Sequence, residues 1–433
     1  MKNIIITLII SMLFSDHAFA QILLSQQQCR EMALKSNEEL QKANNAQEQA
    51  RLEKAIAFAS YFPELDGNAT GIYKPKNLEI MNMDLQIKGT YMAGISLTQP
   101  VYTGGKITAS NKMAKIKLAS SEESIRLTKM HVIADADKAY WTYVAVNEKV
   151  RMLESYYNQL DILYKQTENS VKVEMATENE LLRIGAKRSQ IRYQLQKAEN
   201  GAELCRLSLC NVIGADLETT IAVADTTIVI TSLMQTVDDI SMRPELKLAE
   251  KRIELDEQQV KLARANLLPT VALSAQYSRF GGLKYSGMVD NNGEPAYFSN
   301  NVNNGSSMFM LSVNIPLFHW GKETKKVKQA KIQLANSRLD LQQDKRLFSI
   351  ELQQAIRNVH DCYNMIQTAD TGMEVAKESL RIMKKRYQTS MCSLTDLLDA
   401  QTQWHEAYSN YIEAQTQYKI SETEYLKAAG ILQ

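Results

Sequence analysis

The longest regular pattern in the chain is a heptad repeat of apolar side chains within stretches that lack helix breakers. Residues 106–173 contain neither proline nor glycine, and residues 322–388 contain only Gly372. In the second stretch, apolar or small residues recur in alternating steps of three and four, from Leu352 to Tyr387. Such a 3.5-residue spacing is typical of left-handed coiled coils. It predicts two long helices, over about 105–173 and about 321–388, each on the order of 100 Å long at 1.5 Å per residue.

A second heptad helix is predicted after each long one, over about 178–213 and about 394–430. Thr177 and Glu180 form one capping-box pattern, and Ser393 and Asp396 form another. A capping box satisfies backbone donors at a helix start, so each pair marks a helix that restarts after a tight reversal. The chain therefore contains two long antiparallel helical hairpins.

Shorter segments alternate between apolar and polar residues with a period of two. Examples are Tyr91 to Leu97, Val271 to Tyr277 and Phe309 to Ile315. Period two is typical of strands with one apolar face, and we predict β-hairpins over about 61–102 and about 268–318. Four strands do not bury that face by themselves, and a membrane forbids open sheet edges, so in a bilayer the strands would have to pair with other chains. The alternative is a small soluble sheet packed on helices.

The chain is an internal duplication. The motif QPVYTGGK at 99–106 reappears as IPLFHWGK at 315–322, an offset of 216 residues, and upstream of the hairpins the offset is 206. A shared register over this length indicates a repeated unit of helix, β-hairpin, very long helix and helix. The predicted repeats are 21–214 and 241–433, and the second has the longer hairpin loop. A connector at 215–240 is expected to lie against the outside of the helices.

The N-terminus resembles a secretory signal peptide over residues 1–20. Lys2 supplies a positive charge, 4–14 is apolar, and Ala18-Phe19-Ala20 is a cleavage pattern. No later segment has the uninterrupted apolar length of a transmembrane helix. The residues before Cys29 do not form a lipobox, so no lipid anchor is expected.

Composition excludes several other classes of protein. Fifty basic and 49 acidic residues give a net charge of +1, without the basic excess that a nucleic-acid partner favours. The five cysteines have no disulfide or zinc spacing, so no metal is expected. Gly104-Gly105-Lys106 does not fit a P-loop, and the histidines lie in no catalytic motif, so neither an enzyme activity nor a cofactor is expected. The 19 methionines are interpreted as packing residues rather than a copper site.

The duplication, the two strand-to-helix motifs and the run YQTSMCSLTDLLDAQTQW at 387–404 together resemble the TolC family of outer-membrane efflux proteins. The resemblance implies a mainly α fold with a membrane β part. In a homotrimer, twelve strands would form one β-barrel in outer-membrane lipid, and twelve helices an α-barrel tunnel across the periplasm. It further implies a channel of a tripartite efflux or type I secretion system, which docks onto a periplasmic adaptor and an inner-membrane transporter.

The resemblance also assigns roles to individual residues. The pore mouth would be formed by Tyr387, Asp396, Asp399, Glu180 and Cys392. The best-known members have arginine where this chain has Cys392, so Lys384, Lys385 or Arg386 would have to supply the positive charge. Adaptor docking would involve the hairpin tips, and the membrane interface would be lined by aromatic side chains. The tip residues are Met175, Ala176, Thr177, Met391, Ser393 and Leu394, and the aromatic residues are Tyr102, Phe318 and Trp320.

Two readings of the carboxylates stay open. Asp396 and Asp399 are three residues apart on one helix face, so three chains would bring six carboxylates to one opening and favour cations. Alternatively, Asp396 completes the helix cap and Asp399 is solvated. At the level of the whole chain, the rival to a passive export channel is a soluble periplasmic coiled-coil adaptor without a pore.

Overall fold

The computed structural model describes residues 22–76, 78–80, 83–86, 89–230, 232–291 and 294–433. The predicted signal peptide at 1–20 lies outside the described residues. The chain divides into two compact units, each described here by itself. Unit 1 comprises Met1–Asn45, Glu123–Lys247 and Gln343–Gln433, and unit 2 comprises Ala46–Glu122 and Leu248–Gln342.

The helices occupy the stretches without breakers. The two long helices are α4 (Lys106–Lys172) and α7 (Lys322–Gln388), and both have residues in each unit. Each is followed by a shorter partner, α5 (Glu178–Ile213) after α4 and α8 (Leu394–Ala428) after α7. The helices that precede the strands are α3 (Glu38–Ala59) and α6 (Pro244–Ala265). Proline fits the start of α6 because the first turn of a helix does not use its missing N–H.

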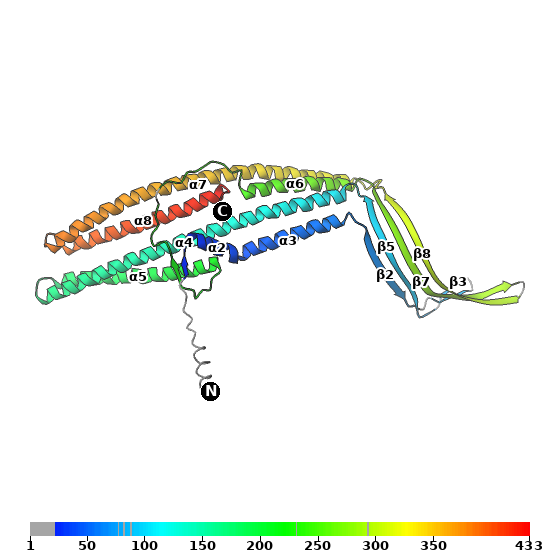
Figure 1. The fold of residues 1–433 in the computed structure, drawn as a ribbon, viewed down its shortest axis with the longest axis horizontal. Coiled ribbons are helices and arrows are strands. Elements are labelled where there is room, and N and C mark those ends of the chain that lie inside the picture. Colours follow the sequence, from blue (N-terminus) through cyan, green and yellow to red (C-terminus); the bar gives the residue numbers. More distant parts are fainter. Residues whose placement is uncertain (1–21, 77, 81–82, 87–88, 231, 292–293) are drawn as a thin grey trace, which may run out of the picture. The chain divides into compact units, whose positions relative to one another are not determined.

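Unit 2 contains an antiparallel sheet (Figure 1). Its strands are β2 (Glu64–Ile72), β3 (Leu78–Ile80), β4 (Met83–Gln86), β5 (Thr90–Tyr102), β7 (Thr270–Asn291) and β8 (Glu294–Asn314). Strand β7 lies between β5 and β8, and β2 pairs with the other side of β5. The two short strands β3 and β4 pair with each other, and β4 also pairs with β7 beyond the end of β5.

The segment predicted as a longer loop in the second repeat is instead strand. β7 and β8 remain paired from Thr270↔Asn314 to Asn291↔Glu294, with one register shift between Phe280 and Leu283. At this shift Gly282 has φ +79°, and an added Cβ would lie 2.4 Å from the Gly89 carbonyl oxygen. The prediction was wrong because this segment is rich in asparagine and glycine, and the ladder hydrogen bonds of a long hairpin do not depend on those side chains.

The sheet has one apolar face and one polar face, set by the strand register. Leu65, Leu97, Ala275 and Phe309 lie in one row across the four strands. Leu65 is 69% and Phe309 82% exposed, so the described residues leave this apolar row uncovered.

Unit 1 contains the two helical hairpins, α4–α5 and α7–α8 (Figure 1). Every predicted seam position of α7 from Leu352 to Tyr387, and of α8 from Leu397 to Ala428, is buried or half-buried. Arg188, which interrupts the α5 seam, lies 4.2 Å from the Tyr164 ring and donates to Asp161 at 2.9 Å. This arginine therefore keeps its charge paired inside the seam.

The start of the described chain packs on α4 in a way that the sequence did not predict. Strand β1 (Ile22–Leu24) pairs in parallel with β6 (Ile221–Val223). The expected single first helix is broken after α2 (Gln26–Ser36), because the Asn37 side chain accepts from the Leu40 amide and starts α3.

A buried ion pair anchors α2. The Arg30 guanidinium donates to both carboxylate oxygens of Asp137 on α4 at 2.7 and 2.6 Å, and Asp137 also accepts from Thr423 on α8 at 2.9 Å. The Asp137 side chain is 1% exposed.

Tyrosines hold the connector at 215–240 against the helices. The Tyr418 and Tyr425 hydroxyls of α8 accept from the backbone amides of Met234 and Val237 at 2.9 and 2.6 Å. On α4, Tyr143 donates to the Ile221 carbonyl at 3.1 Å. The hydroxyls of these tyrosines therefore fix the connector to α4 and α8.

Among the described residues, none of the helices combines the length and the apolar character needed to cross a membrane.

Candidate functional site at the hairpin ends

The two hairpin turns have the same backbone construction. After α4, Glu174 has φ 59° and the Met175 amide donates to the Ser170 carbonyl at 2.8 Å. After α7, Ser390 has φ 57° and the Met391 amide donates to the carbonyl of residue 386, also at 2.8 Å. This six-to-one bond with a left-handed residue is the Schellman helix ending. A non-glycine residue in that conformation costs about 1–2 kcal/mol, so both turns carry some local strain.

Both predicted capping boxes are confirmed. Glu180 donates its amide to the Thr177 hydroxyl at 3.2 Å and accepts from the Thr177 amide at 3.0 Å. Asp396 and Ser393 make the same pair of bonds at 3.2 and 3.0 Å. The hydrogen bonds from Ser393 hold the pKa of Asp396 below its usual value. The capping interpretation of Asp396 is therefore observed, and any role at a pore mouth would be additional.

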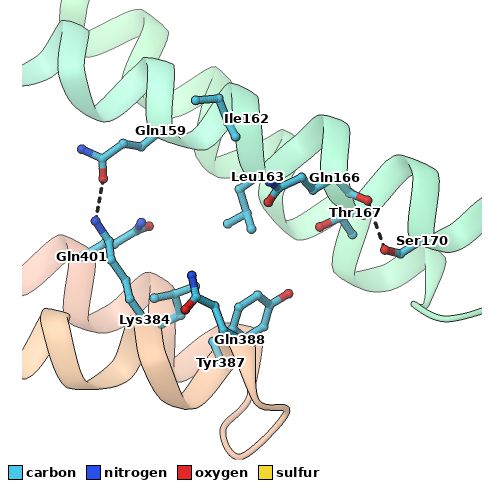
Figure 2. A pocket seen from close by; sticks show the side chains of 11 residues that line it. Gln159, Ile162, Leu163, Gln166, Thr167, Ser170, Lys384, Tyr387, Gln388 and Gln401 are labelled. Carbon is cyan, nitrogen blue, oxygen red and sulfur yellow. Dashed lines mark hydrogen bonds between the residues drawn. The ribbon is translucent and has the colours of Figure 1, made fainter.

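A cavity of about 390 Å³ opens between the two hairpins near these turns (Figure 2). It is lined by residues of α4, α7 and α8, and Lys384 crosses it to donate to the Gln159 amide oxygen at 3.0 Å. Burial lowers the pKa of Lys384. Lys384 was expected only as a substitute charge near Cys392, and it instead joins α7 to α4.

Tyr387 also lines this cavity and is half-buried. Burial is the main cause of the raised pKa of its phenol, the Glu180 charge adds to it, and the Thr167 hydroxyl acts in the opposite direction. Tyr387 and Glu180 therefore interact electrostatically across the two hairpins, although Glu180, like Asp396, also caps its own helix.

A second polar link between the hairpins involves residues that sequence reasoning missed. Arg183 of α5 donates to the Thr395 hydroxyl of α8 at 2.6 Å. A signal was present, because Arg183 is equivalent to Asp399 at the offset of 216 residues, a charge reversal within the duplication.

The remaining predicted mouth residues lie apart from these links. Asp399 is exposed on α8, one turn beyond Asp396. The half-buried Cys392 donates its thiol to the Met383 carbonyl at 3.6 Å, so its side chain contacts its own hairpin.

The predicted docking residues differ in exposure. Met175 and Met391 are 84% and 73% exposed at the two turns, Thr177 and Ser393 are also exposed, and Ala176 is half-buried. Leu394, by contrast, is buried against the hairpin at 3% exposure. The docking role of Leu394 therefore stays a prediction, and its buried side chain does not support it.

The predicted interface aromatics belong to unit 2, where the strands meet the helices. Tyr102 at the end of β5 is 45% exposed, and Phe318 and Trp320 before α7 are 69% and 86% exposed. The Phe318 and Trp320 rings lie 5.1 Å apart.

One turn along α8 from Gln401, a histidine is buried without hydrogen bonds. His405 stacks on Tyr156 of α4 with ring centroids 3.7 Å apart and contacts Trp404 at 4.5 Å. Neither imidazole nitrogen has a partner among the described residues. Burial, with the charges of Lys384 and Lys187, lowers the pKa of His405 to about 3.

Within the described part of the chain, acidic, histidine and cysteine side chains form no group of three or more that could hold a metal ion.

Comparisons with known proteins agree over nearly the whole chain. The model of the family described as outer membrane efflux protein matches residues 29–214 and 239–430. The solvent efflux pump outer membrane protein SrpC of Pseudomonas putida is 21% identical, over 96% of this chain and 86% of its own. A crystal structure of CusC has a TM-score of 0.78 at 15% identity, covering 96% of this chain and 95% of CusC. The CmeC outer membrane channel of Campylobacter jejuni has a TM-score of 0.74 at 20% identity, covering 94% and 85%.

Proposed function

Because the chain belongs to the outer membrane efflux protein family, we propose that three copies form one continuous conduit, which conducts cargo passively and has no catalytic activity. The chain is an outer-membrane efflux channel, and the comparisons give no support to a soluble adaptor. In the proposed homotrimer, four long strands from each copy close a twelve-stranded barrel in the outer membrane. The helices form a twelve-helix tunnel in the periplasm.

The observation that carries this proposal is the uncovered apolar face of an open sheet. In its row from Leu65 to Phe309, all side chains except the half-buried Ala275 are exposed, and the strands β2 and β8 each lack a neighbour on one side among the described residues. Unpaired strand edges invite pairing with further strands. In lipid every backbone N–H and C=O group has to be hydrogen-bonded. A barrel closed with strands of other copies would pair the free strand edges and turn the apolar face towards lipid.

Exposed apolar side chains on the helices support assembly in the same way. Leu182, Tyr193 and Leu204 of α5 are 71%, 71% and 68% exposed. Side chains of this size at helical spacing suit packing against the helices of a neighbouring copy.

We propose that the hairpin ends form the periplasmic mouth, with Asp396, Asp399 and Glu180 as its carboxylates. Three copies would gather nine carboxylates there, and such a ring attracts cations. Tyr387 lies between the hairpins and would act in closure, whereas Cys392, bonded within its own hairpin, would only fill space.

We further propose that the exposed tips dock a periplasmic adaptor, which joins the channel to an energy-supplying inner-membrane transporter. Met175 and Met391 are the most prominent tip residues, and methionine suits surfaces that have to repack on a partner. Ala176, Thr177 and Ser393 complete this docking surface. At the other end, Tyr102, Phe318 and Trp320 would lie at the membrane interface, where aromatic rings are enriched.

The test is single-channel conductance of the purified protein in planar bilayers, beside fractionation of cell membranes. The variant Asp396→Asn/Asp399→Asn removes two charges per chain while keeping an oxygen that can cap α8. Its matched control, Glu374→Gln/Glu378→Gln, removes two exposed charges on α7.

We expect wild type and control to be cation-selective and the asparagine variant to lose that selectivity. Equal selectivity in all three would refute the carboxylate mouth but keep the channel. Absence of conductance from a membrane-inserted trimer would overturn the conduit itself.

A further inference from the structure

A basic and aromatic pocket lies in unit 2 between the end of α3 and the start of α4. Its volume is about 640 Å³. Its charged and aromatic lining consists of Arg51, Lys54, Phe58, Tyr61, Lys112 and Lys115.

The walls of this pocket are fixed by contacts between the two helices and the sheet. The Asn111 amide of α4 donates to the Ala57 carbonyl of α3 at 2.7 Å. Gln99 of β5 donates to the Tyr61 carbonyl at 3.0 Å, and the Phe58 and Tyr61 rings meet edge to face at 5.9 Å. The pocket therefore borders directly on the ends of β2 and β5.

The positive charge of this pocket is largely uncompensated. Arg51 pairs with Glu48 at 3.0 Å, but none of Lys54, Lys112 and Lys115 forms an ion pair with another described residue. Residues 106–117, at the start of α4, contain four lysines and no acidic residue. Lysines that converge on one pocket repel each other unless an anion lies between them.

The second repeat provides an internal comparison. Lys112 and Lys115 have counterparts in Lys328 and Lys331 of α7, at the offset of 216. At the upstream offset of 206, however, Arg51 is replaced by Glu257, which pairs with a neighbouring arginine of α7 at 3.0 Å, and Lys54 by a buried valine. The basic pocket is therefore specific to the first repeat and is not a consequence of the repeated backbone.

We propose that this pocket binds the phosphate headgroup of an anionic phospholipid in the periplasmic leaflet of the outer membrane. Lysine and arginine side chains bind phosphate through charge-assisted hydrogen bonds. Phe58, 57% exposed, and Tyr61, 42% exposed, would contact the glycerol and the first acyl carbons, as aromatic side chains do at membrane interfaces.

The location favours a lipid over a free anion. This inference rests on the proposed function, which puts β2 and β5 in the membrane and so the pocket at headgroup level. A free phosphate has no apolar part that could contact the exposed aromatic rings beside the lysines.

The experiment uses the full-length protein in neutral detergent and measures bound lipid by native mass spectrometry. The probes are phosphatidylglycerol and, for comparison, phosphatidylcholine, with inorganic phosphate as competitor. The test variant is Lys54→Gln/Lys112→Gln/Lys115→Gln. Its matched control is Lys325→Gln/Lys328→Gln/Lys331→Gln, which removes the same charge from the second repeat.

We expect wild type to prefer phosphatidylglycerol and the test variant to lose at least about tenfold in affinity, because each lysine near an anionic headgroup contributes about fivefold. The control variant should keep its affinity, and arginine at the three test positions should restore it. Equal losses in both glutamine variants would mean diffuse attraction and would overturn the pocket. Absence of lipid preference, or displacement by millimolar phosphate, would overturn the lipid assignment.

The outcome that would refute the proposed function differs from the one that would refute lipid binding. The proposed function fails if wild type is missing from the membrane fraction or does not conduct. The lipid inference predicts that the test variant still inserts and conducts while it loses bound phosphatidylglycerol.

Discussion

Acid should loosen the contact between α4 and α8 through His405. This imidazole is 6% exposed, stacked on Tyr156, and without a hydrogen-bond partner among the described residues. Its folded pKa of about 3 lies below the ordinary histidine value of 6.5. An unfolded or opened chain therefore binds a proton more readily than the folded chain. The contribution of the neutral His405 to the stability of this contact is therefore full above about pH 6.5, and it is lost as the pH falls from there towards 3.

The magnitude follows from the two pKa values. At pH 5 the opened state lies about 1.5 pH units below its pKa of about 6.5, and each unit is worth about 1.4 kcal/mol, which gives about 2 kcal/mol per chain. At pH 7.5 the same difference is close to zero. The variant His405→Phe keeps a ring on Tyr156 but has no proton to bind, so this pH-dependent loss should disappear.

Hydrogen exchange of the α8 amides around residues 400–412 measures this local opening directly. After correction for intrinsic exchange rates, wild type should lose about 2 kcal/mol of protection between pH 7.5 and pH 5, about a 30-fold rise in opening. His405→Phe should not show this loss, and the control His360→Gln, at an exposed position of α7, should behave as wild type. If wild type and His405→Phe lost protection equally, His405 would not be the group that couples acid to opening.

Four further substitutions test other parts of the fold. In a denaturant titration, Gly430→Ala should lower the free energy of unfolding by about 1–2 kcal/mol, because Gly430 has φ +75° and an added Cβ would lie 2.6 Å from the Arg243 amide nitrogen. Gly372→Ala should raise the free energy of unfolding by about 0.5–1 kcal/mol in the same titration, because an added Cβ there meets nothing within 4 Å and alanine favours a helix over glycine. Asp137→Asn should lower it by about 1.5–3 kcal/mol, since the Arg30 guanidinium, 20% exposed, loses its partner carboxylate, and thermal unfolding would contradict this if the midpoint were unchanged. Lys384→Met removes a link between α7 and α4 worth about 1 kcal/mol per chain, so conductance of the closed channel should rise, and an unchanged conductance would exclude a role in closure.

Periodic features of this chain could be read from the sequence because burial repeats along the helix. The seam from Leu352 to Tyr387 is buried or half-buried at every predicted position, since a 3.5-residue spacing keeps one stripe facing the partner helix. The caps at Thr177 and Ser393 could also be predicted from the sequence, because a capping box involves only residues three apart along the chain.

Contacts between distant polar residues could not be predicted in the same way. Arg30 and Asp137 are separated by 107 residues, and Lys384 and Gln159 by 225. A polar residue on a helix leaves the same sequence pattern whether it is solvated or paired across the fold, because periodicity records only which stripe is apolar. The β1–β6 pairing was missed for a related reason: three residues are too few to establish a period of two.

The polar links between the two hairpins involve residues that differ between the repeats. At the offset of 216, Glu168 corresponds to Lys384 and Arg183 to Asp399, whereas the capping residues keep their chemistry. Identical hairpins side by side would bring like charges together at these positions, which is unfavourable. The charge reversal avoids this repulsion, and Arg183 and Lys384 instead bond to the neutral side chains of Thr395 and Gln159 on the other hairpin. The duplication thus preserves the backbone of the hairpin ends, while the exposed side chains determine which hairpin packs beside which.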